Sequence, residues 1–428
     1  MAREWNELPF SEAVLLNPAT PLARGAVYPF VEMSAIEAGM RDVECSERRE
    51  FTGGGSRFQN RDTLMARITP CLENGKLARF QAPAGEPVGH GSTEFIVIRG
   101  RPNVTDNDYA YYLTISPEVR SFAISQMTGT SGRQRVPTNS LGGLAVPLPP
   151  LAEQKAIASI LGALDDKIEL NRRMNSTLEG MARALFQSWF VDFDPVRAKL
   201  DGRKPEGMDK ATAALFPDAF QESPIGNIPK GWNAIPLYDT AQWVNGAAFR
   251  SEDFCATGEG LPVIKIAELK DGISAQTKWC QRTAGPNQII ATGDLLYSWS
   301  GSPDTSLEAF LWSGGCGMLN QHIFKVISPT AAEKRFVYYL LHYLRPVLVE
   351  TARNKQTTGL GHVTIADMKR LLVCLPSKAV LAAFDRNIAP IFDKAFNNTL
   401  ESRTLATLRD TLLPKLLSGE LSVVNFLL

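Results

Sequence analysis

The sequence of 428 residues contains an internal duplication with one fixed offset of 227 positions. Tyr111-Tyr112-Leu113, for example, returns as Tyr338-Tyr339-Leu340. The match is densest in residues 148–185, where 10 of 38 positions are identical to residues 375–412 without a gap. This period is far too long for a solenoid. It predicts a chain built twice from a variable segment of about 150 residues and a better-matched segment of about 40.

Both well-matched segments have the heptad pattern of a long helix. Seam residues recur in alternating steps of four and three, as in a coiled coil. The first seam comprises Ile157, Leu161, Leu164, Ile168, Asn171, Asn175, Leu178, Ala182, Leu185 and Trp189. The second comprises Phe384, Ile388, Ile391, Ala395, Asn398, Ser402, Leu405, Arg409, Leu412 and Leu416. We expect the first helix to begin after Pro149-Pro150. We expect the second to run from about Ser377 to Leu413 and to end before Pro414.

Asn171 and Asn398 occupy the same seam position. A buried asparagine there fixes register and partner choice at a cost in stability; the alternative is a solvated asparagine on an ordinary core helix. Forty helical residues span roughly 60 Å, which indicates a spacer. The apolar residues beyond the seam are expected to leave more surface than one partner helix covers. They are Met174, Met181, Phe186 and Phe190.

The variable segments have the pattern of α+β domains, in which short β-rich runs alternate with glycine- and proline-rich turns. Strands are predicted at Glu94–Arg99 and His322–Ile327, and short helices at Asp108–Ile115 and Lys334–Leu344. The fold class is therefore α+β, with two duplicated α/β domains separated by two long helices that form an antiparallel coiled coil. The expected divisions are a first variable domain (1–148), a long helix (149–190), a linker (191–229), a second variable domain (230–375) and a second long helix (376–421).

Composition and missing motifs favour a binding protein over an enzyme. The sequence contains no phosphate-binding loop of the P-loop type, no G-x-G-x-x-G, no H-E-x-x-H and no G-x-S-x-G. Asn17-Pro18-Ala19-Thr20 lacks the second proline and the aromatic residue of an amino-methyltransferase motif. The six cysteines and four histidines are dispersed, and the formal net charge is zero. We therefore expect a soluble cytoplasmic protein with reduced thiols, no structural metal and no membrane span.

One loop in each variable domain has residues suited to nucleic acid. Residues 119–152 contain no acid. Glycines allow a close backbone approach, hydroxyls contact phosphate, and Arg and Gln can pair bidentately with guanine and adenine. A solvated turn is the alternative for either loop alone. The candidates are Thr130, Ser131, Gly132, Arg133, Gln134 and Arg135 in the first domain, and Lys355, Thr357, Thr358, Gly359 and His362 in the second.

A second candidate surface lies around a predicted strand and turn in the first domain, between residues 57 and 76. The corresponding part of the second domain, residues 293–302, is a predicted strand followed by a small polar loop. Direct contact with bases is one interpretation, and an ordinary polar surface is the other. The candidates are Arg57, Gln59, Arg61, Arg67, Thr69, Asn74 and Lys76 in the first domain, with Ser298 and Ser300 in the second.

These residues carry a resemblance that covers essentially the whole chain. The sequence resembles the DNA-specificity subunit of type I restriction-modification systems. The most specific stretch runs from Leu148 to Asn171, beginning LPPLAEQKAI. Similar stretches are Ile68–Lys76, Ala184–Pro195, Lys230–Trp232 and Leu412–Leu421. One departure is that the second helix lacks the Leu-Ala-Glu-Gln lead of the first.

The resemblance implies that each variable domain reads one half of a bipartite site in double-stranded DNA, and that the paired helices set the spacer between the halves. It also implies that two methyltransferase subunits dock on the helical regions and that endonuclease-translocase subunits join them. S-adenosylmethionine, ATP and magnesium belong to those partners, so no cofactor and no catalytic residue is expected in this chain.

Two other classes of protein remain as alternatives. The first is an enzyme with its own methyltransferase or nuclease site, which the missing motifs disfavour. The second is a coiled-coil scaffold that bridges proteins without recognising DNA. Protection of a two-part DNA site would exclude the scaffold.

Overall fold

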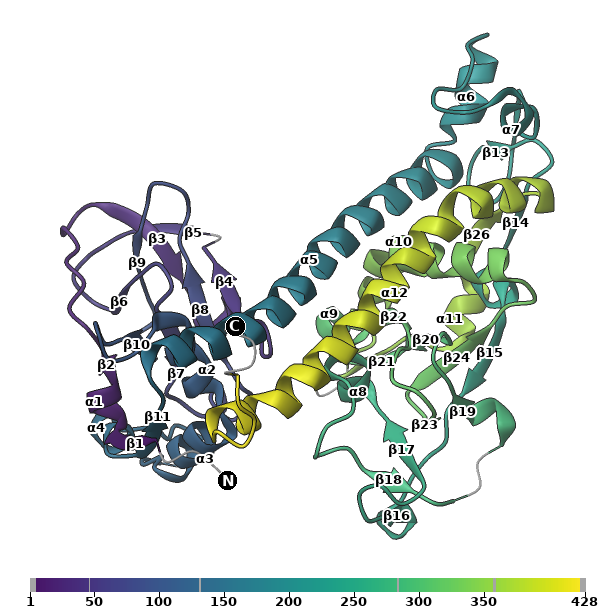
Figure 1. Cartoon of the computed structure of the whole chain (residues 1–428). Helices are drawn as coiled ribbons and strands as arrows, with labels where there is room; N and C mark the ends of the chain where they lie inside the picture. Colours follow the sequence, from purple (N-terminus) through teal and green to yellow (C-terminus); the bar gives the residue numbers. More distant parts are fainter. Residues whose placement is uncertain (1–4, 46, 131, 283–284, 357–358, 424–428) are drawn as a thin grey trace. The chain divides into compact units, whose positions relative to one another are not determined.

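The computed structural model describes residues 5–45, 47–130, 132–282, 285–356 and 359–423. The chain separates into two compact units, each of which combines one variable domain with parts of both long helices (Figure 1). Unit 1 comprises residues 1–170 and 401–428, and unit 2 comprises residues 171–400.

Two long helices, α5 (Leu151–Phe190) and α12 (Lys378–Leu417), extend through both units, and each unit contains a segment of each helix. Each has 40 residues, so the offset of 227 holds at both ends. Every predicted seam residue is buried or half-buried. Within each unit the two helices run antiparallel, as the ion pair Asp165–Arg409 and the ring contact Phe186–Phe384 illustrate. The predicted fold class is confirmed.

Unit 1 contains two mixed sheets. The five-stranded sheet has the order β2 (Val14–Leu16), β10 (Phe95–Gly100), β7 (Thr63–Ala66), β8 (Leu77–Gln81), β4 (Asp42–Glu44). The four-stranded sheet has the order β5 (Glu47–Glu50), β3 (Val27–Val31), β9 (Val88–Gly91), β6 (Ser56–Gln59). A separate pair joins β1 (Asn6–Pro9) to β11 (Ala145–Leu148). The helices are α1 (Phe10–Ala13), η1 (Met33–Ala35), α2 (Asn107–Ile115), α3 (Pro117–Ser125) and α4 (Thr138–Gly142).

Unit 2 repeats this plan with different details. Its four-stranded sheet has the order β15 (Gln242–Asn245), β24 (Ile323–Ile327), β20 (Leu295–Ser298), β22 (Glu308–Leu311). Its five-stranded sheet has the order β16 (Phe254–Cys255), β18 (Trp279–Cys280), β17 (Leu261–Ile264), β23 (Gly317–Leu319), β19 (Ile289–Ile290). Short pairs join β14 (Asn233–Pro236) to β26 (Leu372–Leu375) and β21 (Ser300–Gly301) to β25 (Gly361–His362).

The helices of unit 2 outside the shared pair include α10 (Ala331–Arg353), which is longer than the predicted 334–344. The others are η2 (Leu237–Thr240), η3 (Ser251–Asp253), α8 (Ile266–Asp271), η4 (Pro286–Gln288), α9 (Pro303–Ser306) and α11 (Ile365–Arg370). Residues 191–229 contain α6 (Asp194–Leu200), α7 (Lys210–Ala214) and the strand pair β12 (Phe220–Gln221) and β13 (Ile228–Pro229). This segment packs through aromatic rings, since Phe216 meets Trp189 edge-on at 5.0 Å.

The long helices are part of the domain cores. In unit 1, Ile157 and Leu161 of α5 join Leu413 and Leu416 of α12 in the core beneath α2. In unit 2 the helices contribute aromatic residues, and the ring of Phe384 lies 4.8 Å from that of Phe190. Burying large apolar side chains contributes about 1.5–3 kcal/mol each. Each domain is therefore packed continuously with the helix segments of its own unit.

Two expectations about these helices are wrong. Helix α12 does not end before Pro414 but continues to Leu417. An internal proline costs about 3 kcal/mol, and burial of Leu413, Leu416 and Leu417 in the unit 1 core offsets that cost. Phe186 and Phe190 do not form a surplus apolar surface, because both are buried in unit 2. Of the four residues named, Met181 is the exposed one, at 54%.

Three seam amides in unit 2 hydrogen-bond across the helix pair. The Asn398 Nδ2 donates to Asn175 Oδ1 at 2.9 Å, and Asn175 Nδ2 donates to Thr399 Oγ1 at 3.2 Å. Asn171 Nδ2 donates to the Asn398 carbonyl at 3.4 Å. Asn171 and Asn398 are buried, so a slip of the register would break these bonds inside the interface. The seam asparagines are therefore buried rather than solvated, as the register interpretation requires.

We expect Phe384→Ala to lower the free energy of unfolding of unit 2 by about 3–5 kcal/mol, because Phe384 is fully buried among aromatic rings. Met181→Ala on the exposed face of α5 serves as the control and should change it by less than about 0.5 kcal/mol. Urea denaturation followed by circular dichroism measures both. Equal losses for the two variants would contradict the packing described here.

Candidate nucleic-acid interface

Backbone hydrogen bonds within residues 128–135 hold the loop before α4 in shape. Thr128 and Arg135 exchange two backbone hydrogen bonds, at 3.0 and 2.9 Å. Between them Gly129 and Gly132 have positive φ angles of 128° and 80°, a conformation that favours glycine. The result is a small hairpin whose described tip residues, including Thr130 and Arg133, are exposed.

This hairpin is attached to the second stretch of residues predicted from the sequence. The backbone N–H of Gln134 donates to Thr69 Oγ1 at 3.0 Å, and the backbone N–H of Thr69 donates to the backbone carbonyl of Gln134 at 3.0 Å. The Val136 amide donates to the Arg67 carbonyl at 2.8 Å. Arg67, Thr69 and Gln134, far apart in the sequence, therefore belong to one surface.

The two arginines of the hairpin differ in their electrostatics. Arg135 forms a forked ion pair with Glu94, with Nη2–Oε1 at 2.7 Å and Nε–Oε2 at 2.9 Å. The hydrogen bonds from Arg135 lower the pKa of Glu94 below its ordinary value, so the pair stays charged. Arg133 lies at the exposed tip. Most of the positive charge that the hairpin offers a ligand therefore comes from Arg133.

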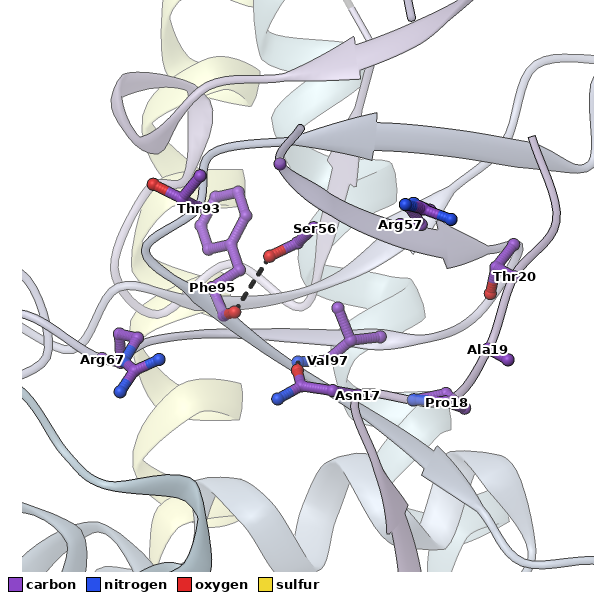
Figure 2. A pocket seen from close by; sticks show the side chains of 11 residues that line it. Asn17, Pro18, Ala19, Thr20, Ser56, Arg57, Arg67, Thr93, Phe95 and Val97 are labelled. Atoms are coloured by element: carbon purple, nitrogen blue, oxygen red, sulfur yellow. Dashed lines mark hydrogen bonds between the residues drawn. The ribbon is translucent and has the colours of Figure 1, made fainter. Parts of the chain in front are cut away.

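A cavity of about 410 Å³ opens beside this surface, between β6 and β10 (Figure 2). Arg57 and Arg67 lie on different sides of it, and hydroxyl groups line the space between them. The Arg67 Nε is buried and has no hydrogen-bond partner among the described residues. The remaining lining residues are Asn17, Pro18, Ala19, Thr20, Gly55, Ser56, Thr93, Phe95 and Val97.

Asn17 has a structural role in the wall of this cavity. It has a positive φ angle of 47°, which asparagine tolerates better than most residues. Its backbone N–H donates to the Val97 carbonyl at 2.7 Å, and its side-chain Oδ1 accepts from the backbone N–H of Val97 at 2.9 Å. These bonds attach residues 17–20 to β10. They account for the asparagine without any role in methyl transfer.

Several predicted residues of the first domain do not line the cavity. Arg61 pairs with Asp108 and lines a separate charged cavity beside α5. Lys76 Nζ donates to the Met33 carbonyl at 2.8 Å. Gln59 on β6 and Asn74 in the turn after β7 are exposed. Ser131 lies outside the described residues.

In the second domain the structure removes two candidates from the surface. Ser298 on β20 has no exposed area, and Ser300 on β21 is 4% exposed. The prediction of a polar surface loop is wrong for these two residues, because both lie in strands and both are buried. Thr357 and Thr358 lie outside the described residues. Gly359 and Lys355 are exposed, and Lys355 pairs with Asp367.

Trp299, which lies between those two serines in the sequence, is surrounded by a cluster of polar and aromatic side chains. His362 on β25 pairs with Ser300 in the sheet, and its ring lies 5.9 Å from that of Trp299. The ring of His322, which directly precedes β24, lies 5.8 Å from that of Trp299. Trp299 Nε1 donates to Asn245 Oδ1 at 3.1 Å. Burial, reinforced by the charge of His362, lowers the pKa of His322 below its ordinary value.

Sequence reasoning identified His362 in this cluster but not Trp299, Asn245 or His322. Asn245 lies on β15, Trp299 directly follows β20 and His322 directly precedes β24, so only the sheet order brings them together. The one signal available was an aromatic residue within a short polar loop, and that pattern alone is common. Among the described residues, no group of three or more His, Cys, Asp or Glu side chains is placed to hold a metal ion. Nor is any described helix long and apolar enough to cross a bilayer.

The family model for the type I restriction modification DNA specificity domain matches residues 79–180 and 229–409. The type I restriction enzyme HindI specificity subunit of Haemophilus influenzae is 26% identical over 377 residues, covering 77% of this chain and 81% of that protein. The MjaIX specificity subunit of Methanocaldococcus jannaschii is 25% identical over 321 residues, covering 74% and 69%. The crystal structure of a type I restriction-modification S subunit from M. genitalium has a similar fold, with a TM-score of 0.53 at 15% identity over 96% of each chain.

We expect Thr69→Ala to loosen the hairpin, because the Gln134 amide loses its bond to the Thr69 hydroxyl. A lost hydrogen bond of about 1–1.5 kcal/mol should speed hydrogen exchange at Gln134 by roughly tenfold. Exchange measured by mass spectrometry on peptides covering residues 128–136 tests this. Thr130→Ala at the exposed tip is the control and should leave the Gln134 rate unchanged. Equal acceleration in both variants would show that Thr69 does not anchor the hairpin.

Proposed function

Because this chain belongs to the family of type I restriction-modification DNA specificity subunits, we propose that each of its variable domains reads one half of a bipartite site in double-stranded DNA. Recognition domain 1 comprises residues 1–148, and recognition domain 2 comprises residues 230–375. Helices α5 and α12 are the spacer between them. The chain itself is non-catalytic and works in the compartment that holds the DNA, the cytoplasm.

The observation that carries this proposal is a contrast between duplicated helices and divergent domain surfaces. The long helices and the strand pairs at their bases keep the offset of 227 without a gap. The candidate surfaces differ, with a glycine-rich arginine hairpin in one domain and a tryptophan–histidine cluster in the other. A duplicated frame that holds two unlike surfaces suits the reading of two unlike DNA sequences.

In recognition domain 1 we assign base reading to the hairpin and phosphate binding to the cavity. Arg133 and Gln134 can pair bidentately with guanine and adenine edges in the major groove. Arg57 and Arg67 flank a cavity with hydroxyl groups, and guanidinium and hydroxyl groups are common phosphate ligands. Thr69 positions the hairpin, and Glu94 limits its charge.

In recognition domain 2 the proposed contacts are Lys355, Gly359 and His362, with Trp299 and Asn245 beside them. The Trp299 ring supports His362 from one side. Lys355 and Gly359 stand on the exposed loop that follows α10. Among the described residues of this loop and the end of α10, Arg353 pairs with Asp304 and Lys355 pairs with Asp367, so we expect this surface to depend more on hydrogen bonding and apolar contact.

The partners in this proposal are two methyltransferase subunits, which dock on the helical regions, and endonuclease-translocase subunits, which join that complex. Antiparallel pairing of duplicated helices creates two quasi-equivalent surfaces, so two identical partners can bind one asymmetric chain. Exposed Leu170 and Met181 on α5 and Leu408 on α12 offer apolar contacts for them. S-adenosylmethionine, ATP and magnesium would bind to those partners and not to this chain.

The proposal is tested by footprinting the chain, with its methyltransferase partner, on DNA fragments that carry the site found by methylation mapping. Two protected stretches separated by an unprotected gap are expected. Protection of one continuous stretch would overturn the bipartite reading. Absence of any protected sequence would favour the scaffold alternative.

We expect Arg133→Ala and Gln134→Ala to weaken recognition of one half-site only. Losing one bidentate contact should cost roughly 1–3 kcal/mol for the correct base and relax selectivity at that position. Competition binding against DNA with substitutions in either half measures this. Lys355→Ala is the reciprocal control and should affect the other half. If Arg133→Ala weakened binding to all sequences equally and lowered only the salt dependence, Arg133 would be a phosphate contact.

We expect a longer helix pair to lengthen the unread gap. A copy of residues 169–175 is inserted after Asn175 and a copy of residues 396–402 after Ser402, so that both seams stay in phase and the copied asparagines keep their partners. Each helix grows by roughly 10 Å, which is about three base-pair rises. Methylation mapping should show unchanged half-sites and a longer gap. An unchanged gap with full activity would show that the helices do not set the spacing.

A further inference from the structure

A buried ion pair joins the two long helices in unit 1. Arg409 of α12 donates to Asp165 of α5, with Nη1–Oδ1 at 2.7 Å, and the two side chains are 9% and 3% exposed. Tyr112 of α2 donates its hydroxyl proton to the other oxygen of Asp165 at 2.6 Å. Arg409 also donates to the Gly39 carbonyl at 3.4 Å and to Asp410 at 2.9 Å. Burial alone would lower the pKa of Arg409. The charge of Asp165 and the hydrogen bonds to Asp410 and Asp165 outweigh burial and raise the pKa above its ordinary value, so the guanidinium stays charged.

The duplicate of this contact is apolar. The offset of 227 puts Phe392 at the place of Asp165, Ala182 at the place of Arg409 and Tyr339 at the place of Tyr112. In unit 2, Phe392 and Ala182 are both buried in one hydrophobic core. The ring of Tyr339 lies 6.2 Å from that of Phe392. The same position of a duplicated frame is thus charged in one unit and aromatic in the other.

We infer that Asp165 and Arg409 select the partner of each long helix, so that α5 accepts α12 and rejects a second copy of α5. The duplication makes such wrong pairs geometrically available, since both helices have 40 residues and equivalent seams. In a pair of two α5 helices in this register, each Asp165 would face Ala182 of the other copy. In a pair of two α12 helices, each Arg409 would face Phe392. A buried charge without its counter-ion is strongly destabilising.

Of the seam asparagines, Asn171 and its duplicate Asn398 do not make this distinction. Asn171 and Asn398 occupy equivalent positions, so a pair of identical helices would again place asparagine near asparagine. They can fix the register, whereas only a residue pair that differs between the two copies can tell the helices apart. The ion pair supplies that difference, and Tyr112 ties it to the domain of unit 1.

The consequence for recognition rests on the proposed function. A pair of identical helices would present two copies of one recognition domain and therefore read a symmetric site. The mixed pair presents two different domains and reads an asymmetric site. Partner selection itself is a property of the helices, and it is measured without DNA, so failure of the recognition proposal would not affect the test.

The test uses the folded full-length chain with a protease site inserted after Lys204, in the exposed stretch of residues 201–204. Cleavage after purification leaves an N-terminal fragment with α5 and a C-terminal fragment with α12, still paired. The nicked protein is incubated in moderate urea to allow exchange, returned to buffer and analysed by native mass spectrometry. For the unsubstituted sequence we expect mixed pairs almost alone. A statistical mixture of identical and mixed pairs would overturn the inference.

Single substitutions give an asymmetric result that mere destabilisation does not produce. Asp165→Asn removes the charge but keeps the shape, and it should allow pairs of N-terminal fragments while pairs of C-terminal fragments stay absent. Arg409→Met should do the reverse. The exposed ion pair Lys167–Glu401 joins the same helices, and its double alanine variant is the control, expected to leave the mixture unchanged. Fragments of either single variant that still form only mixed pairs would overturn the inference.

Discussion

The structure depends on the burial of helix side chains inside the domain cores. Ile157 and Leu416 belong to the core of unit 1, and Trp189 and Phe384 belong to that of unit 2. A recognition domain cannot turn on its helix segment without exposing these residues to water, at about 25 cal/mol for each Å² of apolar surface. The helices are therefore more than a connector, because each domain uses them as one wall of its own core.

Polar contacts within this apolar frame give it specificity. The Asn398 amide donates to Asn175 and the Asn175 amide donates to Thr399 across the seam, and Asp165, Arg409 and Tyr112 form a charged junction in unit 1. Replacing such groups with apolar ones often costs little stability. Their value lies in the arrangements that they exclude, since a shifted register or a wrong partner would leave a buried amide or charge without a bond.

The sequence predicts most of this frame, because a duplication and a heptad pattern are local properties of the chain. The length of α5, the seam and the paired asparagines all follow from spacing alone. The end of α12 was missed, since the packing that carries the helix through Pro414 is tertiary. The candidate site was harder to predict. Nothing near Arg135 in the sequence announces Glu94, and nothing near Ser298 announces that its strand is covered on both faces.

The strand pairs at the base of each domain explain how such different surfaces can share one frame. In β1–β11, Asn6 lies opposite Leu148, and in β14–β26, Asn233 lies opposite Leu375, in the same register. Each pair brings the beginning and the end of its domain together directly before a long helix. The chain between the two strands can then change in sequence and loop structure while its two ends stay fixed. Variation of the domain surfaces is thereby separated from the two long helices, provided that the residues facing α5 and α12 keep their packing.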